Sequence, residues 1–188
     1  MTKSVNPAET PRIAPASAPY EAAIEAAFAR AMPAGMEPLH LFRTMARSPR
    51  ILRKMFAGSL LDSGGISLRE REILILRTTA ACGSEYEWGV HVTMFAGRAE
   101  LTEQELRATL EFPANAEAWA SQDLLLLQLA DELHRHSQVS DAVWDSLTLH
   151  YSEEQLLEML AIVGYYHTIS FMTNVARLAP EAFAARFP

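Results

Sequence analysis

Residues 67–95 read SLREREILILRTTAACGSEYEWGVHVTMF, and this stretch decides the fold. Ser67 stands three residues before Glu70, the spacing at which a hydroxyl and a carboxylate cap the first turn of a helix. Apolar residues then recur at helical spacing over Leu68–Ala81 and again over Ser84–Ala96. The stretch therefore predicts two consecutive helices joined by a short turn.

The same start signals occur further along the chain. Thr102 precedes Glu105 and Ser152 precedes Gln155 at the capping distance, and no window offers a convincing strand. We expect an all-α fold, a single-domain helical bundle. The remaining helices are predicted at Tyr20–Met32, Leu39–Arg47, Arg50–Leu61, Glu103–Phe112, Gln122–His134, Asp141–Leu149 and Glu153–Ala176.

The chain divides into an arm and one domain. Its 188 residues suit a single core. Residues 1–19 hold four of the ten prolines, which deny a helix its backbone donors, so this segment is predicted to be an extended arm. The arm is either a disordered tail, the commoner case at chain ends, or a segment draped over a neighbouring subunit. Residues 20–188 form the predicted helical domain.

The composition of the chain limits the classes of molecule that it is expected to bind and the cellular compartment in which it is expected to occur. A net charge of −7 removes the electrostatic support for nucleic-acid or anionic-membrane binding, so a small molecule is the expected partner. Cys82 is the single cysteine, which excludes an intrachain disulfide and a cysteine-based structural zinc site and suits a reducing compartment. The first residues lack the apolar core of a signal peptide, and the longest nearly apolar run, 159–172, is too short to span a bilayer. We expect a cytoplasmic protein.

Three titratable residues stand out in the opening stretch. Glu72 has aliphatic neighbours one turn away on each side, so its carboxylate needs a buried partner. Glu87 and His91 are four residues apart and therefore adjacent on a helix, beside the apolar Trp88. These groups either exchange a proton with a substrate or form a structural polar network between two helices, and spacing alone favours the network.

The segment REILILRTTAACGSEYEWGVH, residues 71–91, resembles the core motif of the carboxymuconolactone decarboxylase family, which also contains the alkylhydroperoxidase D proteins. A looser resemblance runs from about Ser48 to Leu178. In the peroxidase branch a Glu is followed after twelve residues by a Cys, after three more by a second Cys, and after four more by a His. These positions are Glu72, Ser84, Glu87 and His91 in this chain, so both redox cysteines are replaced.

The replaced cysteines weigh against the peroxidase reaction. A thiolate must attack the peroxide and a second thiol must resolve the sulfenic acid, which neither Ser84 nor Glu87 can do. A one-cysteine peroxidase that uses Cys82 and an external thiol is an alternative, although a free cysteine is more often a small buried apolar residue. Family resemblance still leaves alkylhydroperoxidase-like antioxidant activity open.

Glu at the second cysteine position is similar to the decarboxylase branch. That resemblance implies cofactor-free loss of CO2 from a small lactone or keto-acid carboxylate. His91 would return a proton to carbon, Glu87 would orient or recharge the imidazole, and Glu72 would hold both from the facing helix. Arg77 would either neutralise a substrate carboxylate or form a structural ion pair on the helix that carries Glu72, and the ion pair is the commoner arrangement.

The predicted substrate-binding residues are Ser84, Trp88 and Tyr166. Tyr166 lies in residues 156–178, LLEMLAIVGYYHTISFMTNVARL, which are similar in type to a second segment of the family. Gly164 in the middle of that predicted helix indicates a close helix approach or a position beside a pocket. His167 is a weaker candidate for the same pocket.

No metal or cofactor is expected. His134 and His136 fall at a helix end, where an imidazole interacts well with the terminal carbonyls. Glu87 and His91 with Glu72 as a third ligand remain an alternative metal set, but no second histidine accompanies them.

The resemblance also implies a homo-oligomer, a trimer or a hexamer, with the site near a subunit boundary. A third alternative is a family member that has lost catalysis and serves as an oligomeric binding module, because one fold hosts several functions.

Overall fold

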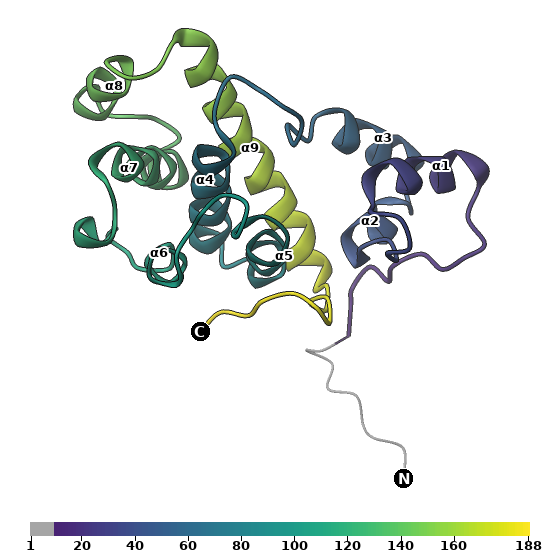
Figure 1. Cartoon of the computed structure of the whole chain (residues 1–188). Helices are drawn as coiled ribbons and strands as arrows, with labels where there is room; N and C mark the ends of the chain where they lie inside the picture. The colour runs from purple at the N-terminus through teal and green to yellow at the C-terminus, as the bar shows by residue number, and fades with distance from the viewer. Residues whose placement is uncertain (1–9) are drawn as a thin grey trace.

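The computed structural model describes residues 10–188, and within this range it contains helices and no strand (Figure 1). This confirms the all-α prediction. The helices are α1 (Ala22–Ala31), α2 (His40–Met45), α3 (Pro49–Ala57), α4 (Leu68–Ala81), α5 (Glu85–Phe95), α6 (Glu103–Ala108), α7 (Ser121–His136), α8 (Asp141–Thr148) and α9 (Glu153–Ala176), with a short 3-10 turn η1 (Ala116–Ala118).

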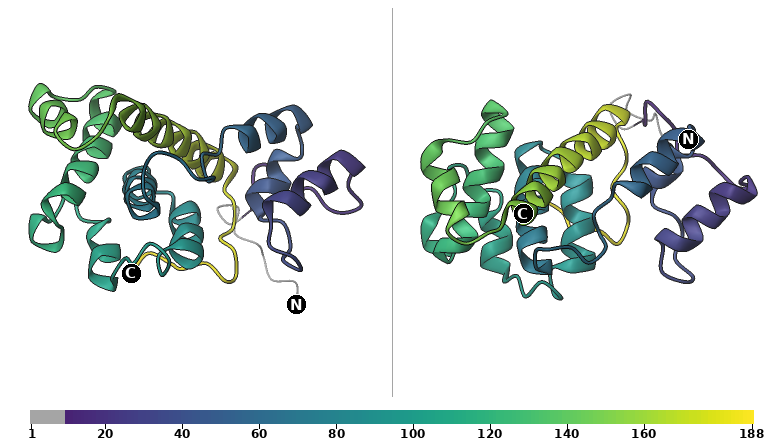
Figure 2. Two further views of the ribbon diagram at one scale, coloured as in Figure 1. Left: turned by 45° about the horizontal axis from the view of Figure 1, so that its top comes forward. Right: turned by 90° about the horizontal axis from the view of Figure 1, so that it is seen from above.

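Helix α4 is the centre of the bundle. It is buried on every side from Arg71 to Ala80 and contacts α5, α7 and α9 (Figures 1 and 2). Enclosure on all sides explains why this helix has no single apolar face, and why Arg71, Glu72 and Arg77 are buried together with its aliphatic residues. Within residues 10–188, no helix is both long enough and apolar enough to cross a membrane, including the 24-residue α9.

The predicted caps are present. The Ser67, Thr102 and Ser152 hydroxyls accept from the backbone three residues ahead, and the side chain at that third position accepts from the cap backbone in return. Helix α6 ends earlier than predicted, at Ala108. The carbonyls of Thr109 and Glu111 leave the helix to accept hydrogen bonds from the buried Arg77, and Pro113 disfavours helix at the residue before it.

Helices α1, α2 and α3 form a second group beside the bundle (Figure 2). Residues 10–19, the described part of the predicted arm, contain no helix and lie against their own chain. The Arg12 amide donates to the Ala176 carbonyl at the end of α9, and the Ala16 amide donates to the Arg43 carbonyl on α2. Residues 1–9 of that arm lie outside the described residues.

The close approach expected at Gly164 is not found. Gly164 is exposed, and a Cβ added there would meet nothing within 4 Å. The close approach occurs instead at Gly89 on α5, where an added Cβ would lie 2.0 Å from the Ala185 carbonyl oxygen. The C-terminal residues that follow α9 therefore run directly over the backbone of α5.

Candidate active site

Helices α4 and α5 bring Glu72 and His91 into direct contact. The His91 Nδ1–H donates to Glu72 Oε2 at 2.7 Å, and the two side chains are 3% and 0% exposed. The other oxygen of Glu72 accepts from Nε and Nη2 of Arg71, each at 3.1 Å. Both oxygens of this carboxylate are thus bound by cationic donors, which makes its burial tolerable.

Glu87 contacts the other side of the imidazole. Its Oε1 lies 3.6 Å from His91 Nε2, a looser contact than that of Glu72. Its Oε2 is buried and has no hydrogen-bond partner among residues 10–188. A buried carboxylate oxygen without a donor is unfavourable in a folded protein, so this atom is positioned to accept a hydrogen bond from a bound molecule.

The two carboxylates keep His91 charged. Burial disfavours the imidazolium, but the charge and the hydrogen bonds of Glu72 and Glu87 outweigh it and raise the pKa of His91 to about 9. The ring also lies 5.0 Å from the Tyr166 ring, edge to face, and 5.1 Å from the Phe95 ring. Burial, with Glu87 next in importance, raises the pKa of Tyr166 well above its ordinary value, so this phenol stays protonated.

His91, Glu87 and Tyr166 line a cavity of about 130 Å³. The cavity lies between α5 and α9 on one side and the α1 to α3 group on the other. No Lys or Arg of residues 10–188 lines it, and most of its wall is apolar, including Met32, Leu41, Phe42, Phe56, Met94 and Ile169. A titratable dyad therefore faces a largely apolar hollow.

Two of the predicted substrate-binding residues lie away from this cavity. Ser84 Oγ is 2.8 Å from Thr173 Oγ1, and the Trp88 indole donates to Thr109 Oγ1 at 2.9 Å, both in buried positions. Ser84 and Trp88 are one helical turn apart and so share the side of α5 that faces the core. Of the three predicted binding residues, the structure brings only Tyr166 to the cavity.

Arg77 is engaged elsewhere. It is fully buried, and its Nε and Nη2 donate to the two carboxylate oxygens of Asp131 on α7 at 2.6 and 2.7 Å. Its guanidinium also lies over the Phe112 ring, 3.6 Å from the centroid. Arg77 is thus a structural ion pair, but with Asp131 rather than with Glu72, and it is not available to a substrate beside His91.

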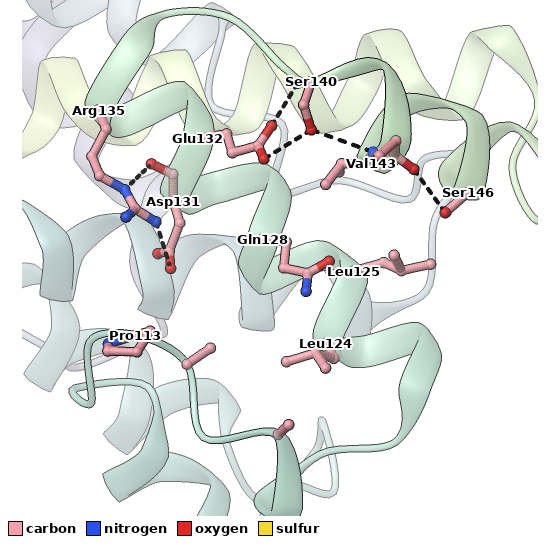
Figure 3. Close-up of a pocket in the computed structure, with 13 residues that line it drawn as sticks. Pro113, Leu124, Leu125, Gln128, Asp131, Glu132, Arg135, Ser140, Val143 and Ser146 are labelled. Atoms are coloured by element: carbon pink, nitrogen blue, oxygen red, sulfur yellow. Dashed lines mark hydrogen bonds and ion pairs between the residues drawn. The ribbon is translucent and has the colours of Figure 1, made fainter.

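A larger recess of about 560 Å³ lies between α7, α8 and residues 113–116, and Figure 3 shows its side chains. Its charged groups already have partners within the recess. Arg135 donates to the Asp131 carbonyl and lies 3.4 Å from its carboxylate, and Glu132 accepts from the amide and hydroxyl of Ser140 (Figure 3). The smaller cavity, which holds the unpaired oxygen of Glu87, is the better candidate site.

Two parts of this site were not predicted from the sequence. Arg71 binds Glu72, but adjacent residues on a helix ordinarily point away from each other, so its place directly before Glu72 gave no signal of the contact. The wall supplied by α1, α2 and α3 has no motif, because any apolar side chain of suitable size can form it.

Comparison with known proteins agrees with this fold. The carboxymuconolactone decarboxylase family model matches residues 48–132. No curated protein sequence matches the chain.

Three solved structures are similar to the whole architecture. An uncharacterized peroxidase-related protein from Silicibacter sp. TM1040 has 14% identity and a TM-score of 0.79, with 100% of both chains covered. A protein from Ralstonia eutropha JMP134, described as an alkylhydroperoxidase AhpD core, has 19% identity and a TM-score of 0.74 over 90% of this chain and 93% of its own. The debrominase Bmp8 has 17% identity and a TM-score of 0.70 over 91% and 92%.

At these identities the structures share the fold with this chain, while the family match covers the sequence that carries Glu72, Glu87 and His91. Residues 48–132 thus match the carboxymuconolactone decarboxylase family model, and the chain has an alkylhydroperoxidase D-like helical fold.

Proposed function

We propose that this protein is an enzyme that decarboxylates a small lactone or keto acid without a cofactor and returns a proton to the substrate carbon. The observation that carries the proposal is an imidazolium in the wall of an apolar cavity. His91 has a pKa of about 9, so it holds a transferable proton at neutral pH.

The proposed reaction is a decarboxylation followed by protonation of the same carbon. The bond between the substrate carbon and its carboxylate breaks, CO2 leaves, and the electron pair delocalises into the conjugated carbonyl. His91 Nε2–H then protonates the carbon, and solvent restores that proton by way of Glu87. The hydrogen bond from Nδ1 to Glu72 holds the ring in place throughout.

The cavity wall favours loss of the charged group. A substrate carboxylate there meets apolar side chains and the Glu87 carboxylate, and the one cation among the described residues of the wall is His91, whose charge is already shared with Glu72. Its ground state is therefore disfavoured relative to a transition state in which the charge is dispersed. About 130 Å³ holds roughly one small ring. The debrominase of the same fold has been solved with 2,3,4-tribromopyrrole, also a single-ring compound.

The alternative peroxidase activity has less support. The sulfur of Cys82 does not line the His91 cavity, and it lies 3.8 Å from His134 in another part of the fold. Burial raises the pKa of the Cys82 thiol, which lowers the fraction of thiolate available to attack a peroxide.

Decarboxylation in D2O tests the proposal. Small single-ring lactone acids and keto acids would be screened for CO2 release, and the product examined for one deuterium at the carbon that lost CO2. We expect His91→Gln to lower the rate by at least about a hundredfold. The exposed His150→Gln is the matched control and should keep the full rate.

Three outcomes would contradict the proposal. A rate unchanged in His91→Gln would remove the imidazole from the mechanism. Peroxide consumption that is abolished in Cys82→Ser, with no CO2 from any acid, would instead identify a single-thiol peroxidase. If neither reaction occurs but one of the acids binds, the chain is a binding module.

We propose a cytoplasmic location for this enzyme, because Cys82 is a free thiol of the kind that a reducing compartment maintains. We also propose that it forms a homo-oligomer, for which the surface of α9 offers a contact.

A further inference from the structure

We propose that Cys82, His134 and His167 bind a divalent transition metal ion, with Zn²⁺ as the first candidate. Cys82 follows the last residue of α4, His134 lies in the last turn of α7, and His167 lies in the middle of α9. Because the three residues are far apart in sequence, no spacing motif reveals them, and no metal was expected from the sequence. The proposal is independent of the proposed decarboxylation.

The donor atoms are close to metal-binding geometry. Cys82 Sγ lies 3.8 Å from His134 Nδ1, which lies 3.0 Å from His167 Nε2, and the three atoms are all within 4.8 Å of one another. A tetrahedral zinc ion, with bonds of about 2.0–2.1 Å to nitrogen and about 2.3 Å to sulfur, separates such donors by roughly 3.3–3.6 Å. Small side-chain rotations therefore suffice to surround an ion.

A hydrogen bond to the backbone orients the His167 ring so that one nitrogen is free to bind a metal. Its Nδ1 lies 2.8 Å from the Val163 carbonyl oxygen, to which it donates, so the lone pair stands on Nε2 and faces His134. A backbone carbonyl behind the ring is the usual second contact of a histidine that binds a metal. The two rings are stacked, with their centroids 5.2 Å apart.

The other two ligands are also suited to a cation. His134 Nδ1 faces both other donors, at 3.8 Å from Cys82 Sγ and 3.0 Å from His167 Nε2. Burial raises the pKa of the Cys82 thiol, an effect that Ser170 opposes. The Ser170 hydroxyl is fully buried and has no hydrogen-bond partner at normal distance in the described part of the chain. It can therefore donate to the thiolate that forms when a metal displaces the thiol proton.

The metal cluster is separate from the candidate active site. Tyr166 and His167 are consecutive on α9, so their side chains point about 100° apart, Tyr166 toward His91 and His167 toward His134. His134 is exposed, which gives an ion access from solvent. Three protein ligands leave the fourth position to water or to an external ligand, as in zinc sites of the catalytic type.

Titration of the full-length protein with Co²⁺ tests this site directly. We expect one equivalent to bind with the absorption of a tetrahedral ion and a thiolate-to-cobalt charge-transfer band. Cys82→Ser should abolish the charge-transfer band, and His134→Gln or His167→Gln should weaken Zn²⁺ binding, measured calorimetrically, at least about tenfold. His136→Gln, an exposed histidine at the end of the same helix, is the control and should bind as the wild type does.

A second measurement does not depend on the spectrum. Zn²⁺ should protect Cys82 from alkylation by iodoacetamide in the wild type and in His136→Gln, but not in His167→Gln. Circular dichroism would establish that each variant is folded. Absence of a charge-transfer band at one equivalent of Co²⁺, or equal Zn²⁺ affinity in the wild type and His167→Gln, would overturn the proposal.

Discussion

At the scale of single residues, His91 is held between two carboxylates that differ in their other contacts. Glu72 binds it closely and is itself bound by Arg71, whereas Glu87 contacts it loosely and has one oxygen without a donor. The first carboxylate therefore serves mainly to hold the ring, and the second is the one available to a bound molecule. This division leads to two predictions.

The contribution of His91 to stability should depend on pH. Its pKa is raised from 6.5 to about 9 on folding, so the stabilisation is complete below pH 6.5 and is lost as the pH rises through 9. We expect the difference in unfolding free energy between the wild type and His91→Gln to shrink over this window by roughly 2–4 kcal/mol. Urea unfolding of both proteins below pH 6.5 and above pH 9 measures this difference. Parallel pH curves for the two proteins would refute the assigned charge.

Neutralising the two carboxylates should have unequal effects. Glu72→Gln leaves Arg71 and His91 buried without their anion, and we expect a loss of about 3–5 kcal/mol in the free energy of unfolding. Glu87→Gln removes a charge that lacks a full set of donors, so we expect a change below about 1 kcal/mol and a lower pKa for His91. Urea unfolding gives the energies and NMR titration gives the pKa. Equal losses in the two variants would contradict this assignment.

At the scale of elements, α5 presents different sides to different neighbours. Glu87 and His91 face the cavity, Ser84 and Trp88 bond to α9 and to Thr109, and Gly89 lies under the C-terminal residues. Neighbouring residues of α5 thus line the cavity, pack in the core and contact the C-terminal residues. Substitutions only one or two positions apart should therefore have unrelated effects.

A substitution at Gly89 tests whether the C-terminal residues pack on α5. In Gly89→Ala the new methyl group would collide with the Ala185 carbonyl, so we expect displacement of the C-terminal residues and a loss of about 1–3 kcal/mol in stability. Gly97→Ala places its methyl group in open space and should change stability by less than about 0.5 kcal/mol. Thermal unfolding compares them. Equal stability of the two variants would show that the terminus does not rest on α5 in solution.

At the scale of the whole molecule, the surface of α9 is the feature that the single chain leaves unexplained. Six of its exposed residues are spaced alternately by four and three, which is the pattern of a coiled-coil seam: Leu157, Ala161, Gly164, Thr168, Phe171 and Val175. Phe171 is 60% exposed and Leu157 is 68% exposed. An apolar seam of this length is typical of a contact with a second copy of the chain.

Charge placed on this seam should dissociate the oligomer. We expect the wild type to have a mass in solution that is a multiple of 20.9 kDa, a trimer or hexamer, and the double variant Phe171→Glu, Val175→Glu to be a monomer. Leu149→Glu, at a residue that is 81% exposed and off α9, is the control and should remain assembled. Light scattering coupled to gel filtration measures the masses. A wild-type monomer, or an assembled double variant, would contradict the prediction.

The sequence by itself determined the helical class, the three capping boxes and the pairing of Glu87 with His91. These features depend on residues within about four positions of one another, where helix geometry alone dictates which side chains meet. Glu72 was predicted to join the pair from the facing helix, and it does so because the short connection at Gly83 turns α4 and α5 against each other.

Only the tertiary structure decided which side of α5 faces a cavity, what closes that cavity, and which partner Arg77 takes. Ser84 stands at the first cysteine position of the family motif and Trp88 lies beside the dyad, so both were predicted to bind the substrate, yet packing turns them into the core. Cys82 and His134 are 52 residues apart along the chain, and His134 and His167 are 33 residues apart. These three residues meet only because α4, α7 and α9 pack together. Contacts of this kind follow from how helices pack as a whole, which no local spacing specifies.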